Sequence, residues 1–183
     1  MTTSEPWTPT QDDFATAEEF YQAILSPLQS DRGVHAETAV AVAARMAGTF
    51  LFRSFNLPMT GVTPGSAVLS DAANEQGPEL IGTLFKMLTA LKVPLDPSKV
   101  KYDTPEDNKP HWTILETQSK LGATFRTTAA RHGLADRRAA LASVMAAAFL
   151  IRDTAPVLDS HIAAGIALYG FVEGTKTAPV TVE

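Results

Sequence analysis

The hydrophobic residues of this chain recur at intervals of three and four positions, which is the spacing of one face of an α-helix. No stretch shows the sustained alternation of polar and apolar residues expected of a half-buried β-strand. The pattern therefore predicts an all-α fold, a single-domain helical bundle of about six helices. We expect the helices at about 10–25, 34–55, 78–91, 110–132, 136–153 and 157–173.

Proline and glycine mark several of the predicted helix ends. Pro78 and Pro110 suit the first turn of a helix, and Gly133 suits the left-handed position that follows a helix. Between the second and third predicted helices, residues 56–77 form one long irregular loop rich in Gly, Pro, Ser and Asn. Such loops in compact domains are often functional. The second and fifth helices are expected to form the buried centre.

The length of 183 residues and the 45% hydrophobic content fit one domain with a proper core and are too small for two. We therefore expect a single helical domain over 1–183, with 1–9 and 175–183 as flexible tails. Only 19% of the residues are charged, which favours a covered surface, as in a homodimer. The small residues around Gly165 in the last predicted helix allow close approach to a neighbour.

The absence of cysteine excludes disulfides, zinc–thiolate sites and cysteine nucleophiles. The first thirteen residues contain no basic residue, which is not the pattern of a signal peptide. The longest apolar stretch, 139–151, is shorter than the roughly 20 residues needed to span a bilayer. These features predict a soluble, cytoplasmic protein that does not bind membranes.

The second predicted helix carries a polar stripe on an otherwise apolar sequence. At 100° per residue the stripe is about 80° wide, and its members are His35, Thr38, Arg45, Thr49 and Arg53. In one interpretation the stripe faces solvent, or its arginines pair with acids on another helix. In the other, Arg45 and Arg53 hold a carboxylate or phosphate, because the planar guanidinium group suits bidentate anion binding.

A second group of polar residues lies around the start of the third predicted helix: Asp71, Asn74, Glu75 and Glu79. Helix capping explains this group, and a carboxylate site for a cation or for general base chemistry is the alternative. The four histidines lack the spacing of a helical metal site, so neither a metal nor a cofactor is predicted. The candidate ligand-binding residues are His35, Arg45, Thr49, Arg53, Asp71, Asn74 and Glu75.

Three functions fit these features. The first is a helical module that binds a small ligand, such as an anionic small molecule, or a partner protein, and that forms a homodimer. The second is an enzyme acting on an anionic small molecule, with Arg45 and Arg53 as anion holders and Asp71 or Glu75 as the acid or base. The third is a weak nucleic-acid binder through the basic residues of 120–138, although the net charge of −5 argues against nucleic acid.

Overall fold

The computed structural model describes residues 7–180 and confirms the all-α fold. Within these residues the structure has six α-helices, which are α1 (Gln11–Leu28), α2 (Ala36–Ser54), α3 (Asp71–Ala90), α4 (Ile114–Arg131), α5 (Asp136–Thr154) and α6 (Ser160–Thr175). A small antiparallel hairpin joins α1 to α2, and two 3₁₀ turns interrupt the connection between α3 and α4. Their bounds are β1 (Gln29–Ser30), β2 (Gly33–Val34), η1 (Pro97–Lys99) and η2 (Glu106–Asn108). None of the described helices is long and apolar enough to cross a membrane.

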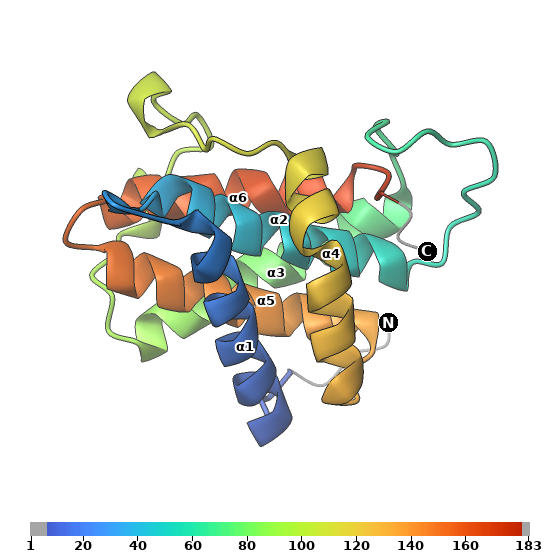
Figure 1. Ribbon diagram of the computed structural model, residues 1–183, viewed down its shortest axis with the longest axis horizontal. Coiled ribbons are helices and arrows are strands. Elements are labelled where there is room, and N and C mark those ends of the chain that lie inside the picture. Colours follow the sequence, from blue (N-terminus) through green and yellow to red (C-terminus); the bar gives the residue numbers. More distant parts are fainter. Residues whose placement is uncertain (1–6, 181–183) are drawn as a thin grey trace.

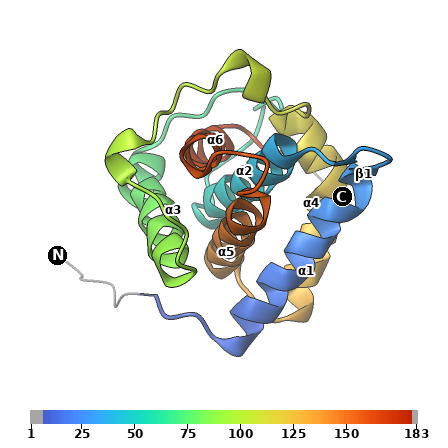
Figure 2. The same cartoon turned by 90° about the vertical axis from the view of Figure 1, so that its left-hand side faces the viewer.

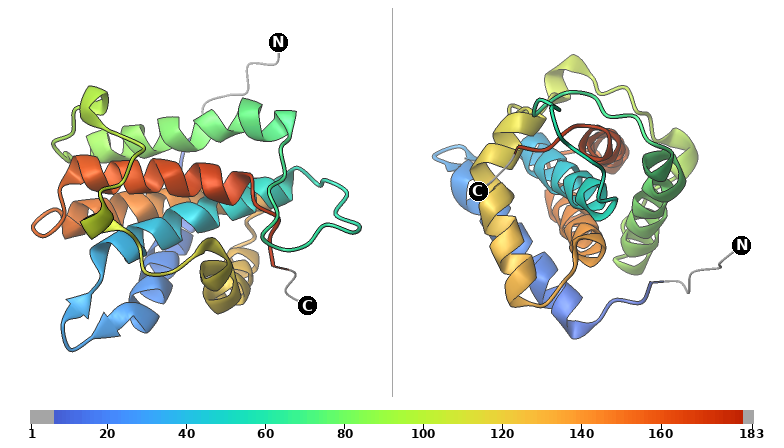
Figure 3. Two further views of the ribbon diagram at one scale, coloured as in Figure 1. Left: turned by 90° about the horizontal axis from the view of Figure 1, so that it is seen from above. Right: turned by 90° about the vertical axis from the view of Figure 1, so that its right-hand side faces the viewer.

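The helices form three layers (Figures 1 and 2). The helices α2, α5 and α6 run lengthwise through the middle of the molecule. The pair α1 and α4 lies across one face of this central layer, and α3 covers the opposite face. Figure 3 shows the segment between α2 and α3 looping out at one end of the molecule. The segment between α3 and α4 instead passes over α6.

The central helices are buried because the outer helices pack on both faces of their layer. All residues of α2 from Thr38 to Phe52 are buried, as are those of α5 from Ala139 to Ala148. The prediction that the second and fifth helices are buried at the centre is therefore confirmed. The helix α6 belongs to the same layer, and its residues 163–168 are buried as well.

Glycines let α2 and α6 approach until their backbones touch. A Cβ atom on Gly174 would lie 2.3 Å from the carbonyl oxygen of Arg45, and one on Gly48 would lie 2.6 Å from the carbonyl oxygen of Phe171. Such distances are far inside van der Waals contact, so that only glycine fits at these two positions. The small residues of α6 are thus used within the chain, and they no longer support self-association.

A buried carboxylate joins α1 to α5. Asp13 is fully buried, accepts the backbone N–H of Thr10 at 2.7 Å in a capping box, and forms an ion pair with Arg138. Burial raises the pKa of Asp13, but the hydrogen bonds from Arg138 and Thr10 outweigh burial and leave the pKa below its ordinary value. Asp13 therefore remains charged in the folded protein at neutral pH.

The helix α3 begins at Asp71 rather than at Pro78. The hydroxyl of Ser70 accepts the backbone N–H of Ala73 at 3.2 Å and caps the helix. Pro78 lies inside the helix, where it removes one backbone hydrogen bond without ending the helix. The irregular segment predicted over 56–77 is consequently shorter and ends at Ser70.

The helix α4 begins at Ile114 rather than at Pro110, because Thr113 and Glu116 form a capping box directly before the first turn. At the other end, Gly133 has a φ of 67°, the left-handed conformation that the sequence predicts. Sequence patterns therefore place the end of this helix better than its start.

The last described residues, 176–180, are held in place by backbone hydrogen bonds, although the sequence analysis assigned them to a flexible tail. The N–H of Val68 donates to the carbonyl of Lys176 at 2.8 Å, and the N–H of Ala178 donates to the carbonyl of Ser66 at 2.9 Å. The segment that follows α2 and the C-terminal segment thus support each other. Of the two predicted tails, residues 1–6 and 181–183 lie outside the described part of the chain.

Candidate functional site

The long connection between α3 and α4, residues 91–113, shapes the candidate site. Its first half rests on α6 at Gly165, where a Cβ atom would lie 2.1 Å from the carbonyl oxygen of Lys101. Because Gly165 has no side chain, the backbone of Lys101 can sit directly on α6. This contact places Tyr102 and Asp103 beside α6.

Polar side chains of α2 hold the second half of this connection. The Nδ2 of Asn108 donates to the Oε1 of Glu37 at 3.0 Å. The backbone N–H of His111 donates to the Oγ1 of Thr38 at 2.8 Å. The connection is therefore attached to α6 at one end and to α2 at the other.

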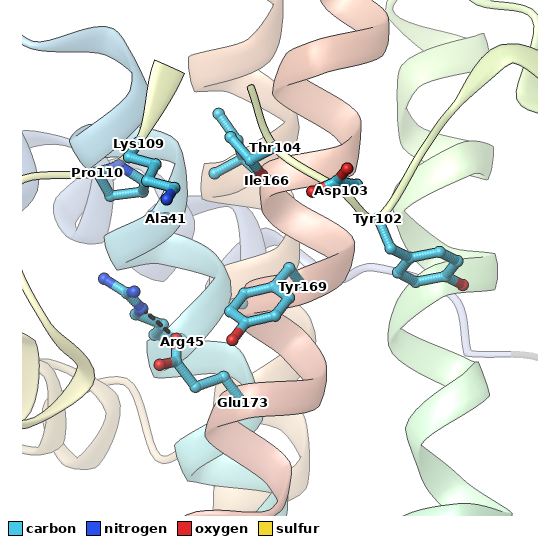
Figure 4. Close-up of a pocket in the computed structure, with 11 residues that line it drawn as sticks. Ala41, Arg45, Tyr102, Asp103, Thr104, Lys109, Pro110, Ile166, Tyr169 and Glu173 are labelled. Atoms are coloured by element: carbon cyan, nitrogen blue, oxygen red, sulfur yellow. Dashed lines mark hydrogen bonds and ion pairs between the residues drawn. The ribbon is translucent and has the colours of Figure 1, made fainter. Parts of the chain in front are cut away.

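Between the two attachments lies a cavity of about 340 Å³, a size typical of small-molecule sites. Figure 4 shows its walls, which come from α2, α6 and the connection above them. The cavity is lined by Ala41, Arg45, Tyr102, Asp103, Thr104, Lys109, Pro110, Ile166, Tyr169, Gly170 and Glu173. It is open to solvent, since Tyr102 is 55% exposed and Tyr169 is 53% exposed.

Charged groups of both signs line the cavity. Figure 4 shows Arg45 and Lys109 on the side of α2, with Asp103 on the opposite side. Lys109 pairs with Glu106, which raises the pKa of Lys109, and the charge of Asp103 adds to the same effect. Within residues 7–180, Asp103 itself forms no hydrogen bond or ion pair. Glu173 is the second acid of the lining, so that the two positive and two negative charges of the cavity cancel.

Arg45 is 7% exposed and is bound by groups from two other segments. Its Nε donates to the Oε2 of Glu173 at 2.6 Å, and its Nη1 donates to the carbonyl oxygen of Trp112. For this arginine, pairing with an acid on another helix is therefore confirmed. A guanidinium group has five N–H donors, and Nη2 bonds to no atom of the described chain. Arg45 thus has N–H donors that form no hydrogen bond within the described chain.

His35 lies at the start of α2, outside the cavity lining. Its Nδ1 accepts the backbone N–H of Thr38 at 3.2 Å and lies 2.8 Å from the Thr38 hydroxyl, and its ring stacks on that of His111 at 3.6 Å. Burial lowers the pKa of His35, and His111 lowers it further, while Glu37 partly offsets both effects. The Nδ1 atom must be unprotonated to accept these bonds, so that His35 acts as a neutral helix cap.

Thr49 and Arg53, at the other end of α2, bind parts of the same chain. The Oγ1 of Thr49 accepts the Nε2 of Gln118 at 2.9 Å, and the Oε1 of Gln118 accepts the backbone N–H of Val180 at 3.0 Å. The Nη2 of Arg53 donates to the carbonyl oxygen of Val180 at 3.3 Å. Burial lowers the pKa of Arg53, and so does Arg126, with a partial offset from Asp136. These groups hold the C-terminal segment against α4.

The structure does not bring the acids of α3 to the arginines of α2. Asp71 and Glu75 are exposed at the start of α3, and Asn74 accepts a hydrogen bond from the Nζ of Lys176 at 3.0 Å. Of the seven candidate residues, Arg45 alone lines the cavity. Within residues 7–180, no group of three or more histidine or acidic side chains is placed to hold a metal ion.

The basic residues of 120–138 are engaged by partners elsewhere in the chain. Arg131 pairs with Glu19, Arg137 pairs with Glu79 at 2.6 Å, and Arg138 pairs with Asp13. Lys120 lies 5.3 Å from the centre of the Trp112 ring. Paired cations have to break these contacts before they neutralise phosphates, which weakens the case for nucleic-acid binding.

Most of the cavity lining was absent from the sequence-based candidates: Tyr102, Asp103, Lys109, Tyr169 and Glu173. From loop length the sequence predicts a functional segment over 56–77 alone. In the structure the connection over 91–113 is the longer of the two. The length of the connection over 91–113 is therefore the signal in the sequence that points to this site.

Comparison of the chain with known protein families, with curated proteins and with solved structures finds no match.

Proposed function

We propose that this protein is a small-molecule-binding module, and that its ligand is a small zwitterion of the amino-acid type. The cavity between α2, α6 and the connection over 91–113 is the binding site. The observation that carries the proposal is the separation of charge across this cavity. Arg45 and Lys109 lie on one side and Asp103 on the other, so a molecule with a carboxylate at one end and an ammonium at the other complements both.

The groups on the α2 side suit the ligand carboxylate. Lys109 is exposed, and its pair with Glu106 lies at the surface, where such pairs contribute about 0–1 kcal/mol. Lys109 can therefore exchange Glu106 for a ligand at little cost. Arg45 has unused donors beside Glu173, and its rigid contacts hold the guanidinium in place before the ligand arrives.

The opposite side suits the ligand ammonium. The carboxylate of Asp103 forms no hydrogen bond or ion pair within residues 7–180, so binding an ammonium there breaks no existing bond. Ile166 and the ring of Tyr169 stand between the two sides, and the ring of Tyr102 lies beyond Asp103. Half-exposed aromatic rings combine an apolar face with a polar tip and recur in ligand sites. A ligand with an aromatic side chain fits this lining best.

Three matched compounds test the charge requirement. L-Phenylalanine carries both charges, phenethylamine lacks the carboxylate, and 3-phenylpropionate lacks the ammonium. We expect saturable binding of L-phenylalanine by calorimetry, with each of the other two at least about tenfold weaker, which corresponds to 1.4 kcal/mol or more. Equal binding of 3-phenylpropionate and L-phenylalanine would contradict the proposal of a zwitterionic ligand. It would favour the site for a simple anion that the sequence suggested.

Two variants separate the ends of the ligand. Lys109→Met should weaken L-phenylalanine and 3-phenylpropionate but leave phenethylamine unchanged. Asp103→Asn should weaken L-phenylalanine and phenethylamine but leave 3-phenylpropionate unchanged. Lys99→Met and Asp107→Asn remove charges from the same connection outside the lining and serve as controls. If the controls weaken binding as much as the test variants, the cavity is not the site.

An enzymatic role and self-association stay separate predictions. The enzyme hypothesis places Asp71 or Glu75 beside Arg45 or Arg53, and no hydrogen bond or ion pair between these groups forms in the described chain. The small residues of α6 no longer support the predicted homodimer, because they pack within the chain. Light scattering after size exclusion tests the homodimer, and a monomer at micromolar concentration would count against it.

A further inference from the structure

A second hollow, of about 540 Å³, lies on the other side of the molecule, between α3 and the segment that precedes α1. Figure 2 shows this segment running from α1 toward α3. The apolar part of the hollow is formed mainly by Phe14, Met87, Leu91 and Phe149. Phe14, one of these side chains, is 47% exposed. The apolar part is therefore open to an apolar occupant.

The floor of this hollow is open because α3 carries small residues there. Gly82 and Ala90 face the hollow, and a Cβ atom on Gly82 would meet no atom within 4 Å. Glycine in the middle of a helix lowers the stability of the protein relative to alanine. No packing contact of the described chain requires glycine at this position, and the surface of α3 is open there.

Three residues that line this hollow carry hydrogen-bond donors that are unused. The Nε1 of Trp7 is buried and has no hydrogen-bond partner in the described part of the chain. Within residues 7–180, neither the hydroxyl of Thr83 nor the ammonium of Lys86 forms a hydrogen bond or ion pair. The one acid of the lining, Glu79, is bound by Arg137 at 2.6 Å. A buried donor without a partner destabilises the folded protein, so an acceptor that reaches Trp7 is stabilising.

We propose that this hollow binds a small amphipathic carboxylate, such as a medium-chain fatty acid. The chain of the ligand packs between Phe14, Phe149 and Met87. Its carboxylate, which only accepts hydrogen bonds, lies at Lys86 and accepts the N–H of Trp7. The site is separate from the cavity between α2 and α6, and either can fail without the other.

The indole N–H of Trp7 provides the direct test. The chain has two tryptophans, so its ¹H–¹⁵N spectrum has two indole signals, and Trp112→Phe assigns them. Decanoate, added below its micelle concentration, should shift the Trp7 signal downfield in a saturable manner and leave the Trp112 signal unchanged. Decylamine has the same chain with a positive headgroup and should bind at least about tenfold more weakly.

Lys86→Met keeps the apolar stem of the side chain and removes its charge. This variant should weaken decanoate about tenfold, the effect of one charge-assisted hydrogen bond, while Lys99→Met should leave decanoate binding unchanged. The proposal is overturned if the Trp7 indole signal does not move, if decylamine binds as well as decanoate, or if Lys86→Met has no effect. If the free protein already shows the Trp7 indole N–H hydrogen-bonded and protected, another occupant fills the hollow, and the proposal fails as well.

Discussion

Replacement of Gly174 by alanine tests the contact between α2 and α6, on which the position of the cavity depends. The new methyl group would lie 2.3 Å from the carbonyl oxygen of Arg45, and 2.9 Å from both the Cα of Gly48 and the backbone nitrogen of Thr49. All three atoms belong to the backbone of a buried helix, and no side-chain rotation can move them away. The two helices must therefore separate.

The magnitude follows from these distances. Carbon–oxygen contacts in proteins settle at about 3.3–3.6 Å, so the two helices have to move apart by about 1 Å near Gly174. A gap of this size removes a quarter to a half of the dispersion energy of each contact that it opens. Overpacking of a buried site costs about 1–3 kcal/mol, and the upper end applies because backbone resists the change. The higher helix propensity of alanine returns at most about 1 kcal/mol. We expect a net loss of about 2 kcal/mol.

Gly82→Ala is the matched control, because it makes the same substitution in a helix where nothing lies within 4 Å of the new methyl group. This variant should gain about 0.5–1 kcal/mol. Urea unfolding followed by far-ultraviolet circular dichroism measures both changes. For a chain of this size, the loss in Gly174→Ala corresponds to a fall in Tm of roughly 4–8 °C. If Gly174→Ala is as stable as the native protein, the close contact between α2 and α6 is not real.

Three further predictions concern groups that hold the helices and the C-terminal segment in place. Asp13→Asn should lower the free energy of unfolding by about 1–2 kcal/mol at pH 7. Because the pKa of Asp13 is lowered in the folded protein, the native protein loses this stability as the pH falls below about 4. The urea midpoints of the two proteins should therefore converge at low pH. His35→Asn keeps a helix cap that accepts a hydrogen bond and removes a histidine whose pKa is lowered. The native protein should lose stability as the pH falls below about 6.5, because the unfolded chain then binds a proton more readily at His35 than the folded chain does. The variant should therefore lose less stability than the native protein between pH 7.5 and 5.5. Gln118→Leu removes the acceptor of the Val180 N–H and should accelerate hydrogen exchange at Val180, measured by NMR.

Each of these predictions has a result that contradicts it. A constant stability gap between the native protein and Asp13→Asn from pH 7 to pH 2 would show that the charge of Asp13 is not responsible. An identical pH dependence in His35→Asn would assign the titration to another group. Unchanged exchange at Val180 in Gln118→Leu, with Ser119→Ala as an exposed control on α4, would mean that Gln118 does not hold the C-terminal segment.

The sequence predicts the helices well because their apolar periodicity is a local property. In the outer helix α1 the buried residues lie three and four positions apart, whereas α2 and α5 are marked by long runs of apolar residues that are buried all round. The start of α3 was misplaced because Pro78 is a strong local signal for a first turn. The cap at Ser70 and the continuation through Pro78 depend on packing that no local rule contains.

The candidate site is harder to predict because its groups meet only in the folded chain. Arg45 and Glu173 are 128 positions apart, and nothing in the sequence pairs them. The polar stripe on α2 predicts that its side chains form hydrogen bonds or ion pairs. In the structure most of these partners lie in the same chain, as the hydrogen bond between Thr49 and Gln118 illustrates. Asp103 belongs to no recognisable sequence motif. It belongs to the site because Gly165 lets the neighbouring backbone rest on α6.

The most direct test of the account is to locate bound L-phenylalanine on the protein. Isotope-filtered NOE spectroscopy with labelled protein and unlabelled ligand reports which side chains the ligand contacts. We expect contacts from the phenyl ring to the methyl groups of Ile166 and to the ring of Tyr169, both of which line the cavity. Saturable binding with contacts elsewhere, such as to Phe14 or Met87 in the second hollow, or no binding at all, would contradict it.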